Sequence, residues 1–417
     1  GALTIEDSAT PVDMPSFVSD KNTGRLASMA WDGNNNATLA YYVTTSNPNA
    51  DGLGTTETTT QHVVSGFGAI VAASDSGSVK QVISVEDGGT LNLNGGMITT
   101  PRTLGNDGHV IFSQGTVNIS GGYVTNGSGG GWGGGLCVTG ANASLNMTGG
   151  VVAANMAASG GGIYADKSAK LNLSGGVISG NATYGNAYDD GDNPNNGYGG
   201  GVFTKKADVT ISGTANITNN RVDSYITKSY NNGLLGGGGI ASVNGGTLTM
   251  VGGSVTANYS HEAGGGIYAG FYGQGIQFAM SGGIIAGNMS ENAEGGGLRI
   301  SGGTNGVIEA ADTSNKVYIT NNKTMTGSQN GRGGDWGGGG VFVQATGKLN
   351  LRAALVTKND AGGWGGGIGA CPTGQTIVTH TNGSAIYNNT DHGEHFSAGG
   401  NGKNEDSDSA YITDTFK

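Results

Sequence analysis

The chain has 417 residues, of which 85 are glycine, and a formal net charge of −11 at neutral pH. So much glycine without a Gly-X-Y period excludes collagen. It also excludes a helical bundle, because each glycine inside a helix costs about 1 kcal/mol relative to alanine. The acidic balance without a basic stripe argues against a nucleic-acid partner, and the shortness of the apolar runs argues against insertion into a membrane.

The first part of the chain, residues 1–74, lacks the repeat that fills the rest of the sequence. We interpret it as an irregular N-terminal cap. Such a cap would cover the open edge of the first repeat, because an exposed strand edge is a template for aggregation. Residues 391–417 are interpreted as a cap or tail at the other end.

Between these segments, residues 75–390 are periodic. A motif Gly-Gly-Gly-Φ, in which Φ is aliphatic, recurs with a shortest spacing of 27 residues, and two weaker units around Ile83 and Val110 precede it. A fixed period of this length is typical of a solenoid. The eight Φ residues are Leu136, Ile163, Val202, Ile240, Ile267, Leu298, Val341 and Ile368.

Each unit contains three short apolar segments with a period of two, separated by Gly, Ser and Asn turns. Such strands cannot bury a face alone, but stacked units align their inward residues in columns. The pattern therefore predicts an all-β fold, a single-stranded right-handed parallel β-helix of about ten coils with three strands each. Each third strand ends at a turn asparagine, and stacked copies would form an amide ladder. These are Asn155, Asn181, Asn219, Asn258, Asn288, Asn321 and Asn359.

The Gly-Gly-Gly-Φ motif followed by a turn asparagine resembles the right-handed β-helix repeats of bacterial surface adhesins and polymorphic outer-membrane proteins. It is also similar to the pectin-lyase-like superfamily, which contains carbohydrate-active enzymes such as lacto-N-biosidases. The resemblance covers about residues 75–390. It implies a secreted or cell-surface bacterial chain that is part of a larger surface protein and has a glycan or host-surface glycoconjugate as its partner. No catalytic residues of these families can be matched one by one.

Three insertions enter the repeat at the same point, between the turn asparagine and the next Gly-Gly-Gly. They comprise residues 184–199, 221–236 and 323–337. In a stack these loops lie side by side along one edge, and such an edge is commonly a binding surface. We therefore expect a groove there. The alternative is that loops at this corner of the coil differ in length without any function.

Aromatic residues gather beside this corner, four or five positions before Φ and one position after it. The position after Φ points outward if Φ points inward, and exposed rings there would stack on sugars. The alternative is that the insertions bury these rings as a second core. The predicted substrate-binding residues are Trp132, Tyr198, Tyr268, Arg299, Trp336, Phe342, Trp364 and His261.

Carboxylates also precede Φ in neighbouring units, at Glu262, Glu294 and Asp335. Adjacent coils lie ~4.8 Å apart, so carboxyls on adjacent or alternate coils would bracket the roughly 5 to 9.5 Å separations of retaining and inverting glycosidases. We predict these three as catalytic, the alternative being solvated loop acids. No cofactor is required, although Asp189, Asp190 and Asp192 form an oxygen-rich loop of the kind that binds Ca²⁺. A turn-rich solvated loop is the alternative for that segment.

Taken together, these patterns predict an extracellular carbohydrate-active β-helix that binds a glycan along the loop-lined edge and hydrolyses it with a carboxylate pair. The alternative is a non-catalytic surface adhesin or ligand-binding domain. Residue patterns alone do not decide between an enzyme and a binding protein, because solenoids serve as both.

Overall fold

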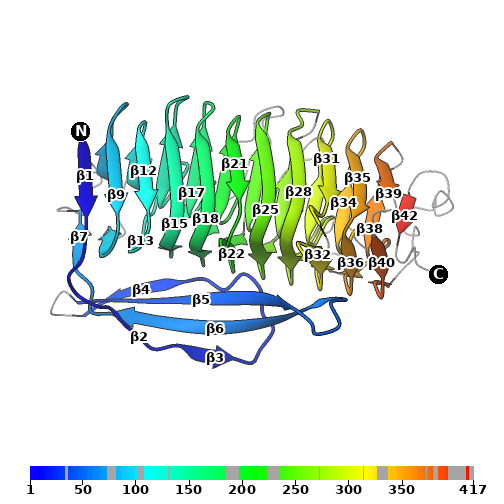
Figure 1. Cartoon of the computed structure of the whole chain (residues 1–417), viewed down its shortest axis with the longest axis horizontal. Coiled ribbons are helices and arrows are strands. Elements are labelled where there is room, and N and C mark those ends of the chain that lie inside the picture. The colour runs from blue at the N-terminus through cyan, green and yellow to red at the C-terminus, as the bar shows by residue number, and fades with distance from the viewer. Residues whose placement is uncertain are drawn as a thin grey trace.

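The computed structural model describes residues 1–32, 36–72, 81–100, 108–129, 131–184, 197–223, 235–271, 273–312, 314–325, 337–371, 373–378, 384–392 and 410–412. This part of the chain is all β and contains no helix, and it forms extensive parallel sheets and one smaller antiparallel sheet (Figure 1). Consequently, none of these residues belongs to a helix that could cross a membrane. The predicted all-β class is confirmed, and the parallel stack is compatible with a β-helix.

The Φ residues lie in an eleven-stranded sheet in which neighbouring units pair in parallel and only the last strand is antiparallel. The two weaker units predicted from the sequence supply its first two strands. The sheet contains β8 (Gln81–Val85), β11 (His109–Ser113), β14 (Leu136–Thr139), β17 (Ile163–Asp166), β20 (Val202–Lys205), β24 (Ile240–Val243), β27 (Ile267–Ala269), β30 (Leu298–Ile300), β34 (Val341–Val343), β38 (Ile368–Ala370) and β42 (Ala410–Ile412).

The second strand of each unit pairs with its neighbours in the same parallel manner. In four units it continues into the third strand, because a Gly-Gly pair such as Gly149-Gly150 bends the chain without ending the pairing. This row contains β1 (Ala2–Ile5), β9 (Thr90–Leu93), β12 (Thr116–Ile119), β15 (Ser144–Ala153), β18 (Lys170–Ser179), β21 (Asp208–Ile211), β25 (Thr247–Thr256), β28 (Gln277–Ala286), β31 (Asn305–Glu309), β35 (Lys348–Ala353) and β39 (Gln375–Val378).

Separate third strands occur in the remaining units, and a fourth strand of two residues, which the sequence did not predict, follows the turn asparagine in the later ones. The third strands are β7 (Ala69–Val71), β10 (Met97–Thr99), β13 (Tyr123–Thr125), β22 (Asn216–Thr218), β32 (Val317–Thr320), β36 (Leu355–Thr357) and β40 (Ala385–Tyr387). The fourth strands are β16 (Met156–Ala157), β19 (Ala182–Thr183), β23 (Arg221–Val222), β26 (Tyr259–Ser260), β29 (Met289–Ser290), β33 (Lys323–Thr324), β37 (Asp360–Ala361) and β41 (Thr390–Asp391).

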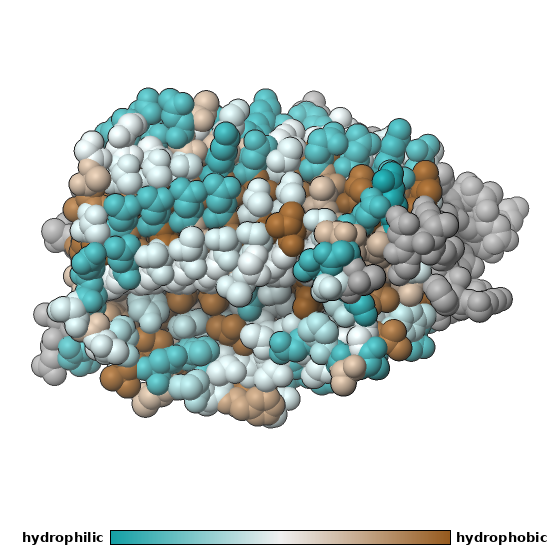
Figure 2. Space-filling view, viewed as in Figure 1, coloured by the Kyte–Doolittle hydropathy of each residue, from teal (hydrophilic) through white to brown (hydrophobic). Residues whose placement is uncertain are grey.

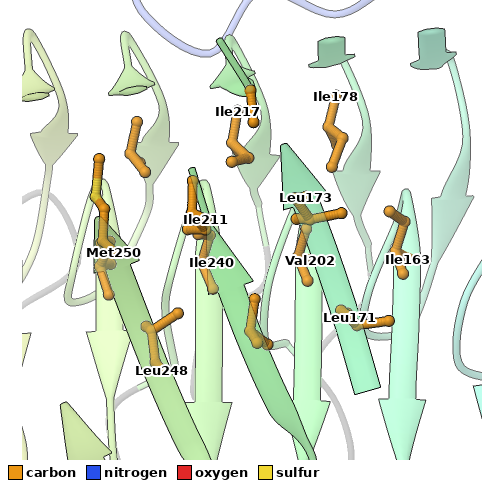
Figure 3. Close-up of a cluster of buried hydrophobic side chains, with 14 of the residues drawn as sticks. Ile163, Leu171, Leu173, Ile178, Val202, Ile211, Ile217, Ile240, Leu248 and Met250 are labelled. Carbon is orange, nitrogen blue, oxygen red and sulfur yellow. The ribbon is translucent and has the colours of Figure 1, made fainter. Parts of the chain in front are cut away.

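We call the strands of one unit a layer. The eight Φ residues pair in register from layer to layer, as in Leu136↔Ile163↔Val202, and all are buried. Figure 3 shows Ile163, Val202 and Ile240 pointing into the same interior as Leu171, Ile211 and Leu248 from the second strands. The predicted aliphatic columns are therefore the central core of the stack.

The Gly-Gly-Gly triplet is required by the close stacking of layers. Gly160 has a φ of +64°, which disfavours any residue with a Cβ. A Cβ on Gly161 would lie 2.2 Å from the carbonyl oxygen of Ala182, and one on Gly162 would lie 2.6 Å from that of Gly201. The first glycine is required by its backbone conformation, and the second and third by the close approach of the next layer, so the triplet recurs as a unit.

The predicted amide ladder is present, with two corrections. Each side-chain Nδ2 donates to the Oδ1 of the next asparagine at 2.9–3.1 Å. The third and sixth predicted members were wrong by one residue. Asn219 and Asn321 adopt a positive φ and donate to the N-terminal segment, at Thr44 Oγ1 and the Thr55 carbonyl, which leaves the ladder to their successors. Its members are Asn155, Asn181, Asn220, Asn258, Asn288, Asn322, Asn359 and Asn389.

The N-terminal segment is more regular than predicted, and its β1 and β7 pair with β9 and β10 of the first predicted unit. It contains an antiparallel sheet of β2 (Val12–Asp13), β3 (Ser16–Val18), β4 (Ser28–Trp31), β5 (Ala37–Pro48) and β6 (Thr55–Ser65), which we call the strap. The strap runs along the side of the stack (Figure 1). Alternate residues of β5, such as Leu39 and Tyr41, pack on Val151 and Ala153 of the stack, which explains why this segment lies on its side.

Hydrogen bonds extend the contact of the strap along the stack. The Thr44 carbonyl accepts from Asn216 Nδ2 at 3.0 Å and from Thr256 Oγ1 at 2.7 Å. Near the hairpin turn, the Gly52 carbonyl accepts from the Tyr318 hydroxyl at 3.2 Å. The strap therefore joins layers that are far apart in the stack.

Candidate functional site

The three insertions leave the stack from one edge, as predicted. Each follows a fourth strand, β19, β23 or β33, at equivalent positions of the eight-stranded sheet. The predicted bounds began too early, because β23 and β33 occupy the first residues of two insertions, and the described residues end at Tyr184, Asp223 and Met325. The predicted catalytic residue Asp335, the predicted sugar contact Trp336, and the predicted calcium ligands Asp189, Asp190 and Asp192 lie outside the described residues.

The outward row that follows Φ, together with Tyr198 four positions before Φ, was predicted to be a glycan platform, and this prediction is wrong for these rings. Tyr198, Tyr268 and Phe342 are buried. Tyr198 lies 5.6 Å from Phe203 and 5.7 Å from Tyr268 between ring centroids. Residues before the next Gly-Gly-Gly motifs, including Leu235 and Ala263, cover the row and make it a second core. Buried rings cannot offer an open face to a sugar.

Two predicted aromatic contacts differ from this buried row. Trp132 is 36% exposed and stacks on Tyr164 with centroids 5.2 Å apart. Trp364 is half-buried and packs edge-on against Phe342. Trp132 is therefore the predicted ring that retains the most surface for a ligand among the described residues.

The predicted pair Glu262 and Glu294 does not form an accessible catalytic dyad. Glu262 is 2% exposed, which removes its carboxyl from contact with a dissolved glycan. Glu294 Oε2 lies 4.0 Å from Nη2 of Arg299, and that arginine is also 2% exposed. The Arg299 guanidinium lies over the Tyr268 ring and donates to its hydroxyl at 3.3 Å. Arg299 is thus part of the second core and not the substrate contact that was predicted.

A different group of polar residues gathers at the root of the insertions. Tyr259 and His261 lie in one layer and Glu291 in the next, and Glu291 follows the strand β29 that pairs with β26. The Tyr259 hydroxyl donates to Oε2 of Glu291. Nδ1 of His261 lies 3.0 Å from the same oxygen, and Nε2 lies 3.3 Å from Nδ2 of Asn292. We call Tyr259, His261 and Glu291 the edge cluster.

The preceding layer adds a second charged pair to this edge. Arg221 pairs in register with Tyr259, and its guanidinium lies 4.2 Å above the tyrosine ring. Arg221 also forms an ion pair with Asp223, the last described residue before the second insertion. Tyr259 therefore contacts Arg221 through its ring and Glu291 through its hydroxyl.

Electrostatics keep Tyr259 in its donor form. Burial raises the pKa of the Tyr259 hydroxyl above its ordinary value, and the hydrogen bond to Glu291 raises it further. The Tyr259 hydroxyl donates to Glu291 Oε2, and Nδ1 of His261 lies within hydrogen-bond distance of the same oxygen. No partner of the other oxygen, Oε1, occurs among the described residues. A carboxylate held in this way can accept a proton through its second oxygen.

Sequence reasoning placed His261 at this corner but did not select Glu291 as a catalytic candidate. The signal that could have located the edge cluster is positional. Asp223, His261 and Glu291 each stand directly after a fourth strand in three successive layers, and that strand was not predicted.

Among the residues that the structure describes, no group of three or more His, Cys, Asp or Glu residues is placed to hold a metal ion. No protein-family model matches the chain, and no curated protein or solved structure matches it either. The function therefore has to be inferred from the site itself.

Proposed function

We propose that the chain is a right-handed parallel β-helix of the pectin-lyase-like kind that acts on glycans outside a bacterial cell, as a secreted or surface protein. The glycan lies along the edge from which the three insertions leave, and Glu291 is the reacting carboxylate. The observation that carries this proposal is the double hydrogen bonding of Glu291 Oε2 by Tyr259 and His261 at that edge.

The chemistry is glycosidic hydrolysis, in which water attacks the anomeric carbon while the bond to the leaving oxygen breaks. The Glu291 carboxylate takes the proton from the attacking water. The leaving oxygen receives a proton from an acid. We assign that role to a carboxyl of the insertions, for which Asp335 stays the sequence-based prediction. No step requires a cofactor, and a Ca²⁺ at Asp189, Asp190 and Asp192 would have a structural role.

A screen against a glycan array, with analysis of products for each glycan that binds, tests this proposal. Glu291→Gln should retain binding and lose turnover by roughly 10²–10⁴-fold, because an amide cannot accept the proton. The matched control is Glu309→Gln, since Glu309 is a surface carboxylate paired with Arg352 at 3.1 Å on another face. Equal turnover in both variants would contradict the role of Glu291.

The second candidate is a non-catalytic adhesin, and a different surface favours it. Asn92, Asn118, Asn146 and Asn172 form an outer amide ladder with spacings of 2.8–2.9 Å. Figure 2 shows polar residues in rows along the stack. Such a flat, rigid array suits binding without cleavage. Binding on the array with no product from any glycan, in the parent protein as well, would favour this alternative.

A further inference from the structure

The eleven second strands of the stack, from β1 to β39, form one long face whose outward side chains stand in three columns. We call it the front face. Each column continues in register from layer to layer, as in Thr90↔Thr116 and Asn92↔Asn118. Figure 2 looks onto this face and shows its polar residues in rows along the stack. The three insertions leave the stack elsewhere, after the fourth strands, so the front face is separate from the edge cluster.

The middle column of the front face has two halves that differ in side-chain length. Its first half is the outer amide ladder, in which hydrogen bonds of 2.8–2.9 Å fix each asparagine to the next. In its second half the side chains end at the β or γ atoms and are therefore shorter than asparagine. They are Thr210, Thr249, Ala279 and Val307, which we call the trough. Beside Ala279 and Val307 the surface has a hollow of about 360 Å³.

A second copy of the chain fits both halves at once. A two-fold axis parallel to the strands, midway between β18 and β21, reverses the stack and sets the outer amide ladder of each copy over the trough of the other. Asn118 then faces Ala279, and Asn146 faces the Thr249 hydroxyl. Each ladder amide still has at least one N–H and one lone pair that the ladder does not use. An axis parallel to the stack would instead set ladder on ladder and leave both troughs empty.

The charges of the front face match under the same axis. Lys170 and Asp208 are neighbours in the first column, one on either side of the axis, so each lysine faces the aspartate of the other copy. In the third column Glu6 lies at one end, where it accepts from Asn94, and Arg352 lies near the other. The axis brings Glu6 of one copy to Arg352 of the other. Both contacts occur twice, because the axis repeats them.

The charge balance and the size of the front face also suit a second copy. Its acidic and basic side chains among the described residues are Glu6, Asp208 and Glu309 against Lys170, Lys348 and Arg352. The face is therefore neutral in a chain whose net charge is −11, and two copies meet on it without strong repulsion. Strands ~4.8 Å apart and about five residues long give the face roughly 800 Å² per copy, the area that a standard interface buries on each partner.

We propose that two copies of the chain dimerise through the front face, with their stacks antiparallel and each outer amide ladder in the trough of the other. The ladder hydrogen bonds hold the asparagine side chains in place before binding, so little entropy is lost when these side chains associate. The contact is closed, because both copies use the same face. A dimer and no longer assembly is therefore the expected product.

Size-exclusion chromatography with light scattering, and sedimentation velocity over a dilution series, test this with the whole chain. The parent should have twice the mass of one chain. Ala279→Arg places a long side chain in the trough and should raise the dissociation constant at least about tenfold. Its matched control is Ile377→Arg, in the same column and 59% exposed but in β39, which the axis leaves without a counterpart. The control should dimerise like the parent, and both variants should melt as the parent does.

Charge reversal tests the orientation of the two copies. Glu6→Lys places two cations together at each end of its own dimer, and Arg352→Glu places two anions there. Each variant alone should therefore associate about three- to tenfold more weakly, the scale of exposed ion pairs. A mixture of the two variants should recover the parent affinity, because both contacts of the mixed dimer join opposite charges.

A parent that stays monomeric over the dilution series overturns the proposal, and so does a dimer that Ala279→Arg leaves intact. If the mixed charge variants associate no more strongly than either variant alone, the antiparallel arrangement is wrong and the proposal fails. A monomer that binds glycans through the outer amide ladder would instead make the front face the binding surface of an adhesin.

Discussion

Two rows of side chains project from opposite faces of the same strands, and both are buried. Ile267 and Tyr268 are neighbours in β27, one in the central core and the other in the second core. The inner row is aliphatic in every layer and is enclosed by its own strands. The outer row varies in type and is covered by segments that precede the next Gly-Gly-Gly motifs. Period-two alternation thus shows which face of the strand a side chain occupies. Its exposure depends on whether another segment of the chain packs on that face.

This difference has a functional consequence. A row of outward rings looks like a sugar platform in the sequence, but covered rings stabilise the fold instead. Polar side chains that keep some exposure lie after the fourth strand of the unit, where His261 and Glu291 of the edge cluster are 17% and 23% exposed. The predictions below test the two rows, from the largest expected effect to the smallest.

The largest effect is expected in the inner row. Ile267→Asp places an unpaired carboxylate among aliphatic side chains and should cost on the order of 5 kcal/mol of unfolding free energy. Denaturant unfolding followed by circular dichroism measures it. Unchanged stability would show that the inner row does not form the core.

The outer row should behave as a core as well. Phe203 packs between Tyr164 and Tyr198 at centroid distances of 5.5 and 5.6 Å, so Phe203→Ala should cost about 3–5 kcal/mol. Phe112→Ala, at the partly buried margin of the same cluster, is the matched control and should cost clearly less. Equal and small costs for both would mean that the outer row is an open face.

A smaller loss of unfolding free energy is expected at Arg299, the charged residue of the outer row. Arg299→Met leaves the Glu294 carboxylate without its cation and should cost about 2–3 kcal/mol, less than for a fully buried pair because Glu294 still reaches water. Adding Glu294→Gln should restore most of the loss. A double-mutant cycle measures the coupling, and strictly additive costs would contradict the pairing.

The smallest effect at neutral pH concerns the first residue of the outer row. Burial raises the pKa of the Cys137 thiol to about 12, against about 8.5 in an unfolded chain. The folded value is the higher one, so this contribution to stability is fully present below pH of about 8.5 and is lost as the pH rises through about 12. Thiol-reagent kinetics at pH 8 should be slow in the native protein and fast in denaturant. Rapid native labelling of Cys137 would mean that the row is uncovered.

Much of the stack could be predicted from the sequence, because each layer contacts mainly its neighbours. The Φ column, the glycine triplets, the amide ladder and the common root of the insertions all follow from a repeat with fixed internal spacing. The ladder was misassigned at Asn219 and Asn321, where two asparagines stand side by side. Only the backbone conformation decides which of the two joins the ladder and which contacts the strap.

The tertiary structure alone decided the features that depend on distant residues. The strap lies on the side of the stack because residues such as Thr44 contact Asn216 and Thr256, and no period links these positions. The outer row is buried because segments from other layers cover it. The edge cluster exists because Tyr259 and Glu291, 32 residues apart, are stacked by strand pairing. Local periodicity determines direction and register, whereas burial and polar partners depend on contacts between segments that the repeat does not relate.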